Sequence, residues 1–327
     1  MAPGLPPMSR STPSLIVTAL AASIGAGVLS GSGGAGAREL APGSMGTPYA
    51  GVGRAASSPA EPVPSARSVA ASEAAGQRAV DEPLDRILDL YVRDGLVYYR
   101  ALRAERSALD RYVRSLRDVP AGFDGWPTGQ RIAFWLNAYN ALVLRTVVDH
   151  YPIRGDFPLY PPDSIRQIPG ALDDVRHTVA GRELTLDEIE SSVLASLGDP
   201  RVFLALGRGA VGSGRLRSEA YSAERLDEQL AAVVEEFATE PWGVVLDRIA
   251  DRVRASPIFG WRREAFVRTY ADRGWTDSGR SPIERAVLNL VESSLFPSER
   301  AFLAQNTFGF EYQEFDWRLN DLTGGRP

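Results

Sequence analysis

The 327-residue sequence contains no cysteine. This absence excludes disulfides, thiolate nucleophiles, iron–sulfur clusters, lipid attachment through cysteine and all zinc sites with cysteine ligands. Because His150 and His177 are the only 2 histidines, a site with three histidine ligands is excluded as well. We therefore expect this protein to use neither a metal ion nor a cofactor.

Lysine is absent too, since all 36 basic residues are arginine. The protein thus lacks a lysine for a Schiff base or a phosphate-binding P-loop. Its formal net charge of −5 disfavours a nucleic-acid partner, because affinity for a phosphate backbone requires a basic face. The remaining composition is ordinary for a globular protein, with 44% hydrophobic and 24% charged residues.

The N-terminus has the pattern of a secretory signal. An apolar run from Leu15 to Leu29 follows Arg10, and small residues lead to Ala-Gly-Ala at 35–37. The run is shorter than a typical membrane span and ends in a plausible cleavage motif. We predict a signal peptide over residues 1–37, with a possible start at Met8, and hence a periplasmic or extracellular protein. A membrane is a partner only if this segment is retained as an anchor.

Residues 38–82 are rich in Ala, Gly, Pro and Ser and show neither a helical nor a strand period. Such a segment buries too little apolar surface to offset its loss of entropy on ordering. We predict a disordered linker there, followed by one globular domain over residues 83–323.

The domain is predicted to be α+β and dominated by helices, with a few short strands around a buried central helix. The central helix follows Thr128, a plausible N-cap, and is apolar on nearly all sides from residue 132 to 148. Two capping boxes, Thr185 with Glu188 and Ser281 with Glu284, are expected to begin further helices. Other apolar periods predict helices at 84–94, 102–116, 185–197, 222–237 and 281–295. Short apolar runs predict strands at 96–99, 202–206 and 244–246.

Several segments occur in the order seen in a known family. The most specific are RIAFWLNAYNALVLRTVV at 131–148 and FDWRLND at 315–321, and others are YVRDGLVYYRAL at 91–102 and SPIFGWRREAF at 256–266. From about residue 84 to 322 the chain resembles the domain-of-unknown-function 547 (DUF547) family. The resemblance implies a shared fold but supplies no established reaction.

The chain departs from this family at four positions. The resemblance implies histidine where Ser191 and Phe203 stand, and cysteine where Arg208 and Ser213 stand. A set of Cys and His side chains supports thiolate chemistry or metal binding. Without it, the chain is predicted to be a divergent member that is non-catalytic or catalytically degenerate.

The central helix carries two amides three residues apart, Asn137 and Asn140, which therefore share a face. A buried amide requires partners, and Asp316 and Asn320 in the C-terminal motif are the expected partners of Asn140. The amides either lock neighbouring loops by hydrogen bonds or line a polar pocket together with Tyr139.

A glycine-rich stretch at 208–217 contains three arginines, among them Arg208 and Arg217. It is either a flexible, solvated loop or a site where backbone N–H groups and guanidinium groups bind a carboxylate or phosphate. Its spacing is not that of a P-loop or a dinucleotide fingerprint. Ser213 is a candidate nucleophile, although the Gly-x-Ser-x-Gly pattern is missing around it.

Carboxylates are the remaining candidates for catalysis. Three of them, Asp187, Glu188 and Glu190, fall in the first turn of a predicted helix, where negative charge is stabilising. Glu188 and Glu190 are also candidates for acid–base work. Arg201, like Arg217, is a candidate for fixing an anionic substrate. His150 is expected to stabilise the end of the central helix.

Two functions follow from these observations. The first is an exported binding domain of the cell envelope, whose ligand is a small molecule, a peptide or an envelope component. The second is a hydrolase or transferase that applies carboxylate and arginine chemistry to an anionic or peptide-like substrate. Two carboxylates and an arginine in one concave pocket would favour the enzyme.

Overall fold

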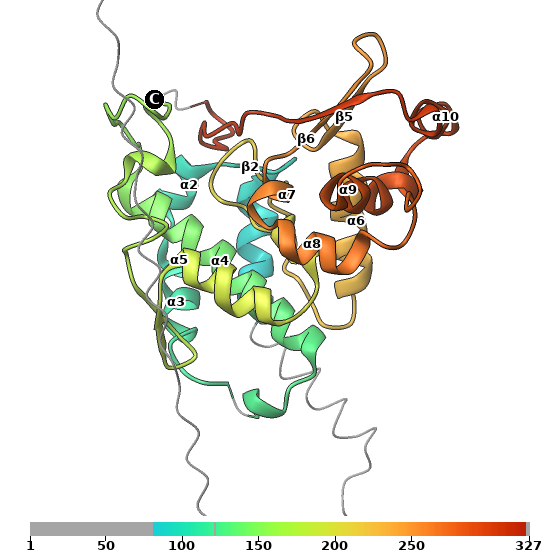
Figure 1. Cartoon of the computed structure of the whole chain (residues 1–327). Helices are drawn as coiled ribbons and strands as arrows, with labels where there is room; N and C mark the ends of the chain where they lie inside the picture. Colours follow the sequence, from blue (N-terminus) through green and yellow to red (C-terminus); the bar gives the residue numbers. More distant parts are fainter. Residues whose placement is uncertain (1–80, 121, 325–327) are drawn as a thin grey trace, which may run out of the picture. The chain divides into compact units, whose positions relative to one another are not determined.

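The structure is a computed structural model that describes residues 81–120 and 122–324 (Figure 1). The predicted signal peptide and all but the last two residues of the predicted linker lie outside this part. Asp81 and Glu82 belong to a helix at 81–91 rather than to a linker. The α+β fold class is confirmed, since the described part is rich in helices and its short strands form small sheets. Among the described helices, none has the length and apolar character needed to cross a membrane.

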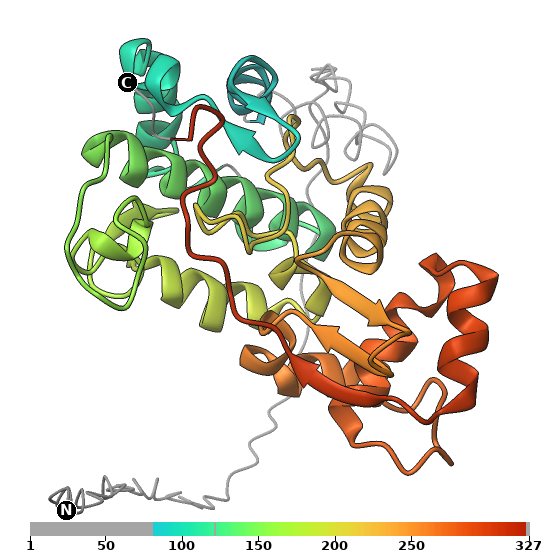
Figure 2. The ribbon, with the colours of Figure 1, turned by 90° about the horizontal axis from the view of Figure 1, so that it is seen from above.

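The central helix is α4 (Thr128–His150), which is buried along most of its length. It packs against α2 and α3 on one side and against η3 on another (Figure 2). Thr128 is not the N-cap: the helix begins directly after Pro127, and no side chain caps it. The extended conformation of Pro127 already sets the direction in which the helix starts. Buried apolar side chains therefore stabilise α4 more than its terminus does.

The N-terminal elements form a hairpin and two helices beside α4. They are residues 81–91, β1 (Val92–Arg93), β2 (Leu96–Val97), α2 (Tyr99–Ala104) and α3 (Ser107–Ser115). The single helix predicted at 102–116 is thus two helices. The break falls at Glu105 and Arg106, whose side chains are bound to Tyr91 and Asp149 respectively.

The middle of the chain alternates short helical turns with one hairpin. Its elements are η1 (Phe123–Gly125), η2 (Ile165–Gln167), β3 (His177–Val179), β4 (Arg182–Leu184), α5 (Leu186–Glu188), η3 (Ile189–Leu194) and η4 (Pro200–Phe203). The capping box of Thr185 and Glu188 is confirmed. The strand predicted at 202–206 is wrong, because the Asp199 side chain caps a 3₁₀ turn with Pro200 at its start.

The C-terminal part combines helices with an antiparallel β5–β6 pair that is extended by the parallel strand β7. Its elements are α6 (Leu226–Thr239), β5 (Val244–Asp247), β6 (Arg252–Ala255), α7 (Ile258–Trp261), α8 (Arg263–Tyr270), α9 (Pro282–Val291), η5 (Glu292–Ser294), α10 (Pro297–Gln305) and β7 (Gly309–Tyr312). The predicted strand at 244–246 is confirmed as β5. The helix predicted at 222–237 forms as α6 but begins four residues later, at Leu226. The N–H of Ser222 donates instead to Gln229 Oε1 at 3.0 Å. The box predicted at Ser281 does not form, because Glu284 pairs with Arg280 instead.

After β7 the chain runs back across the domain (Figure 2). The carbonyl oxygens of Asp316 and Arg318 accept hydrogen bonds from the 208–217 loop, at 2.8 Å from Gly212 N and 2.9 Å from Val211 N. Further on, Asn320 O accepts from Val97 N at 2.8 Å. The C-terminal segment is therefore bound to the glycine-rich loop and to β2.

Asn140 does not contact Asp316 or Asn320, contrary to the prediction. Its Oδ1 accepts from Gly207 N at 2.9 Å, and its Nδ2 lies 3.5 Å from Ala205 O. The loop after η4 lies between α4 and the C-terminal segment. The backbone of this loop therefore supplies the hydrogen-bond partners of the Asn140 amide. Asn320 instead accepts from the Tyr99 hydroxyl at 2.9 Å and donates to Gly95 O at 3.0 Å.

We expect Asn140→Leu to lower the free energy of unfolding by about 1–3 kcal/mol, because Gly207 N–H loses its acceptor. The cost should add to that of Asp316→Leu, since the two side chains share no partner. Tyr99→Phe and Asn320→Leu remove one shared hydrogen bond, so together they should cost less than the sum. Urea denaturation of the singles and doubles measures both cycles, and coupling between Asn140 and Asp316 would contradict this account of the loop.

Candidate functional site

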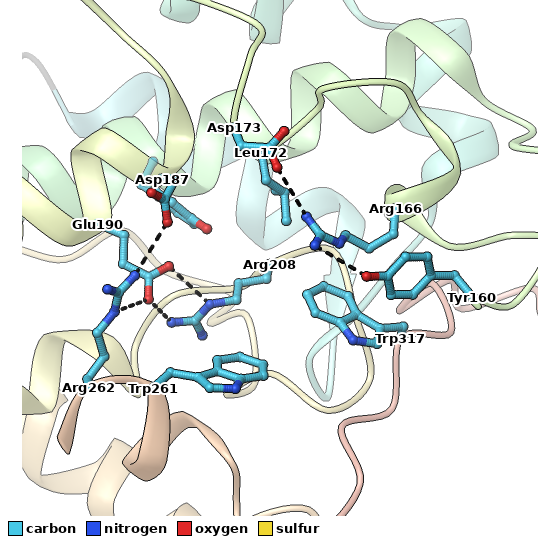
Figure 3. A pocket seen from close by; sticks show the side chains of 11 residues that line it. Tyr160, Arg166, Leu172, Asp173, Asp187, Glu190, Arg208, Trp261, Arg262 and Trp317 are labelled. Carbon is cyan, nitrogen blue, oxygen red and sulfur yellow. Dashed lines mark hydrogen bonds and ion pairs between the residues drawn. The ribbon is translucent and has the colours of Figure 1, made fainter. Parts of the chain in front are cut away.

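A pocket of about 540 Å³ opens beside the end of α5 (Figure 3). Its walls come from α4, from η2 with the chain on both sides of it, and from α5 and η3. The 208–217 loop, the end of α7 and the C-terminal segment complete them. Charged and aromatic groups dominate it. The charged lining residues are Arg166, Asp173, Asp187, Glu190, Arg208 and Arg262. The aromatic ones are Tyr139, Tyr160, Trp261 and Trp317.

Glu190 and Arg208 are the most buried charged residues of this pocket, and the Glu190 side chain is only 6% exposed. It belongs to η3, a π-helical stretch that directly follows the capped turn α5. A π turn adds a residue to the helical repeat, and such turns are frequent at functional sites. Arg208 donates to the carboxylate through Nη2 at 2.5 Å and Nε at 3.1 Å, and Arg262 donates through Nε at 2.9 Å. Both carboxylate oxygens are therefore engaged.

Arg208 is held in place by the loop that it begins. Its guanidinium also donates to Phe203 O at 3.2 Å, and its backbone N–H donates to Ser213 Oγ at 3.0 Å. A Cβ on Gly212 would lie 2.7 Å from Asp316 N, and one on Gly214 would lie 1.9 Å from Leu204 O. The glycines thus allow close packing, and the prediction of a flexible, solvated loop is wrong: most of the loop is buried.

The charges of this cluster are mutually stabilised. Burial alone raises the pKa of Glu190, but the attraction and hydrogen bonds of Arg208 and Arg262 outweigh it and leave the pKa below its ordinary value. Burial lowers the pKa of Arg208, but Glu190 and Tyr139 outweigh this effect and raise it. Glu190 therefore stays ionised at neutral pH, a state that suits neither a general acid nor a proton reservoir.

Two further carboxylates lie nearer the mouth of the pocket. Asp187 is 58% exposed and lies 3.6 Å from Arg262 Nη2. Asp173 is 67% exposed, at 3.8 Å from Arg166 Nη1. The Arg166 guanidinium lies over the rings of Tyr160 and Trp317, 5.2 Å from each centroid. These looser pairs keep donors and acceptors within reach of a ligand.

The other predicted site residues lie outside the pocket. Glu188 caps its helix and pairs with Arg176 at 3.2 Å. Arg201 pairs with Asp199 and Asp227 at 2.7 and 2.8 Å. Arg201 is thus engaged by carboxylates other than Glu188 and Glu190, the two candidates for acid–base work.

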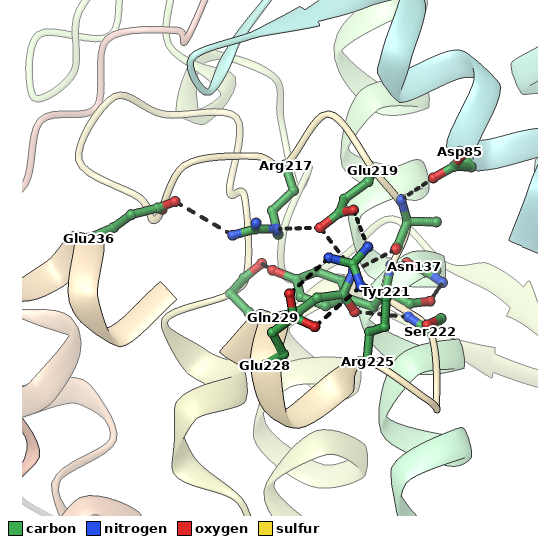
Figure 4. A network of polar contacts seen from close by, with 12 residues as sticks. Asp85, Asn137, Arg217, Glu219, Tyr221, Ser222, Arg225, Glu228, Gln229 and Glu236 are labelled. Carbon is green, nitrogen blue, oxygen red and sulfur yellow. Dashed lines mark hydrogen bonds and ion pairs between the residues drawn. The ribbon is translucent and has the colours of Figure 1, made fainter. Parts of the chain in front are cut away.

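Arg217 and Asn137 belong to a separate polar network around the start of α6 (Figure 4). Arg217 lies 3.3 Å from Glu219 and 3.5 Å from Glu236. Asn137 exchanges two hydrogen bonds with the backbone of Tyr221, at 2.8 and 2.9 Å. This network holds the segment that leads into α6 against α4. The contacts of Asn137 therefore support the interpretation that it fixes a neighbouring loop by hydrogen bonds.

The remaining candidates also have structural contacts. Asp316 binds Arg318 at 2.5 Å, and Ser213 accepts from the backbone of Arg208. His150 Nδ1 lies 2.9 Å from Thr146 O at the end of α4. His177 lies in β3, where burial lowers its pKa. Within 81–120 and 122–324, no three His, Asp or Glu side chains gather as a metal site.

Sequence reasoning missed most of the pocket wall: Tyr160, Arg166, Asp173, Trp261, Arg262 and Trp317. The sequence did contain a signal, because Trp is followed by Arg both at 261–262, within SPIFGWRREAF, and at 317–318, within FDWRLND. The Trp261 and Trp317 rings stack, with centroids 6.2 Å apart and planes inclined by 20°.

Glu190→Leu and Arg208→Leu should each lower the free energy of unfolding by about 3–5 kcal/mol, because each removes one partner of a buried ion pair. After Arg208→Leu, Glu190 keeps only its contact with Arg262. The double variant should lose much less than the sum of the two. Asp173→Asn, at an exposed and loosely paired carboxylate, is the control and should change stability by less than about 0.5 kcal/mol. Chemical denaturation measures all four, and additive losses would show that the two charges do not stabilise each other.

The same pair should make stability depend on pH. Because the pKa of Glu190 is lowered from 4.5 in the folded state, its contribution is complete above that value and is lost as the pH falls through the folded pKa. The difference in unfolding free energy between the native chain and Glu190→Gln should therefore stay constant from neutral pH down to 4.5 and shrink as the pH falls below it. Urea titrations measure it, with Glu264→Gln on the exposed face of α8 as control. A constant difference would contradict the lowered pKa.

One comparison with known proteins yields a match. The model of a family described as protein of unknown function, DUF547, matches residues 123–238. This stretch contains α4, Glu190 and Arg208, whereas Trp261, Arg262 and Trp317 lie beyond it. No curated protein and no solved structure matches the chain. Over this central segment the chain is thus similar to the DUF547 family, as the resemblance of its motifs predicted.

Proposed function

We propose that this protein is an exported, non-catalytic binding domain of the cell envelope and that its ligand occupies the pocket around Glu190. The observation that carries the proposal is the double ion pair of Glu190 with Arg208 and Arg262. It holds the most buried carboxylate of the pocket ionised and fully hydrogen-bonded. A group in this state gives shape and charge to a site without exchanging protons.

The departures from the family support the same function. The four positions at which the resemblance implies Cys or His, namely Ser191, Phe203, Arg208 and Ser213, all lie around this ion pair. Ser191 follows Glu190 in the chain, Phe203 O accepts from Arg208, and Ser213 Oγ accepts from Arg208 N. Arginine, phenylalanine and serine at these positions supply packing and hydrogen bonds in place of a thiolate and its base.

The remainder of the pocket suits a bound ligand. The exposed face of Trp261 provides apolar contact area, while Asp187, Asp173 and Arg166 offer polar groups that are only loosely paired. Binding sites commonly combine aromatic walls with a few polar groups that orient the ligand. Export is supported by the signal-like residues 1–37.

One arrangement favours the alternative, a hydrolase or transferase acting on an anionic or peptide-like substrate. Asp187 and Glu190 share the pocket with Arg262, so two carboxylates and an arginine do meet in one concave site. In this alternative Asp187, not Glu188, is the acid–base residue, because it is exposed at the mouth. Glu190 then only positions Arg262.

Binding without turnover is the expected result when the full chain is mixed with anionic peptides, peptidoglycan fragments and activated esters. Trp261→Ala should weaken ligand binding by about tenfold, roughly 1.4 kcal/mol, because it removes a stacking face. Titrations followed by tryptophan fluorescence and calorimetry measure affinity, and product release measures turnover. Phe296→Ala, at an exposed aromatic residue outside the pocket, is the matched control.

Two results would contradict the proposal. Turnover that Asp187→Asn abolishes while ligand still binds would establish the enzyme. Binding that Trp261→Ala and Arg262→Ala both leave unchanged would place the ligand elsewhere.

A further inference from the structure

A second, smaller hollow of about 210 Å³ adjoins the pocket around Glu190. It lies between the chain that precedes η2 and the loop that follows it, and Phe157 and Gly170 are among its lining residues. The two hollows share Tyr160, Arg166, Leu172 and Asp173. The site is therefore a cleft with two compartments and Arg166 at their junction.

A continuous row of aromatic rings follows this cleft. The Trp261 and Trp317 rings lie 6.2 Å apart, Trp317 and Tyr160 are 5.8 Å apart, and Tyr160 and Phe157 are again 5.8 Å apart, between centroids. Phe315 supports the row from beside Trp317, at 4.4 Å. The row begins and ends on exposed rings, since Trp261 is 45% and Phe157 50% exposed.

Such a row suits a chain of rings better than it suits a peptide. The lining residues of both hollows belong to helices and loops, so an extended peptide finds no strand edge there with which to pair. A pyranose ring, in contrast, has an apolar C–H face that stacks on an aromatic ring and a rim of hydroxyls. Asp173 and Asp187, both more than half exposed, are placed to accept hydrogen bonds from such hydroxyls.

Arg166, at the junction of the two compartments, favours a ligand that carries a negative charge. Its guanidinium lies near the Tyr160 and Trp317 rings, donates to Tyr160 Oη at 3.3 Å, and approaches Asp173 only to 3.8 Å. The planar fork of an arginine presents five N–H donors, and these contacts leave several of them unused. A carboxylate is the group that this fork binds best in bidentate fashion.

We infer that the ligand is a carboxylate-bearing oligosaccharide that spans both compartments. Its sugar rings stack on Trp261, Trp317, Tyr160 and Phe157, and a carboxylate of the chain pairs with Arg166. This inference rests on the proposed binding function and names the ligand class for the same site.

The test uses the full chain and three soluble hexasaccharide probes: oligogalacturonate, hyaluronan, and a peptidoglycan glycan strand with muramyl carboxylates. Each is compared with its methyl-esterified form and with its disaccharide by calorimetry. We expect at least one acidic hexamer to bind about tenfold more tightly than its ester, and Arg166→Gln to abolish that preference. Phe157→Ala should weaken the hexamer about fivefold and leave the disaccharide unchanged, because only the longer chain reaches the second compartment. Phe296→Ala is again the control.

The inference is overturned if no acidic hexamer binds at about 1 mM, if the esters bind equally well, or if Phe157→Ala affects disaccharide and hexamer alike. Because Phe157 is a half-exposed side chain, its loss tests the row without endangering the fold, and a normal melting curve confirms this.

Failure of the proposed function has a different signature. If peptides bind in a Trp261-dependent manner while the glycans do not, only the ligand class is wrong. If no ligand responds to Trp261→Ala or Arg262→Ala, the pocket itself is not the binding site.

Discussion

The buried ion pair between Glu190 and Arg208 is the interaction on which the rest of the site depends. An unpaired charge at this depth would cost several kcal/mol, so the two groups must stay together in the folded state. Each partner brings a different segment: the π-helical turn η3 carries Glu190, and the glycine-rich loop carries Arg208. Arg262 adds the end of α7 to the same carboxylate. The ion pairs of one carboxylate thus hold together three separate segments of the chain.

The glycine-rich loop transmits this constraint to the C-terminus. With no side chain at Gly212, the loop lies close enough to bond the backbone of Asp316, and the neighbouring bond from Val211 to Arg318 continues the contact. Trp317 stands between these two anchor points and is therefore directed to the pocket wall. The aromatic side of the site is in this way a consequence of the packing on its charged side.

Much of the fold was predictable from local pattern, whereas most of the site was not. The continuous apolar character of 132–148 indicates a buried helix whatever surrounds it, and the box at Thr185 depends on neighbours only three residues apart. The strand expected at 202–206 failed because an Asp-Pro start favours a 3₁₀ turn even within an apolar run. Glu190 was a candidate only because it is one of three carboxylates at the start of a predicted helix. Its real partners, Arg208 and Arg262, depend on long-range packing that no local period encodes.

The course of the C-terminal segment makes the aromatic row depend on a few backbone hydrogen bonds. Trp317 lies on the stretch that returns from β7 across the domain, and it joins a row whose other rings come from residues 157, 160 and 261. This stretch is bound through its backbone to the 208–217 loop and to β2. Local unfolding that broke these bonds would remove the central ring of the row while α4 kept its packing against α2 and α3. The integrity of the row is therefore a local property, separable from the global stability of the fold.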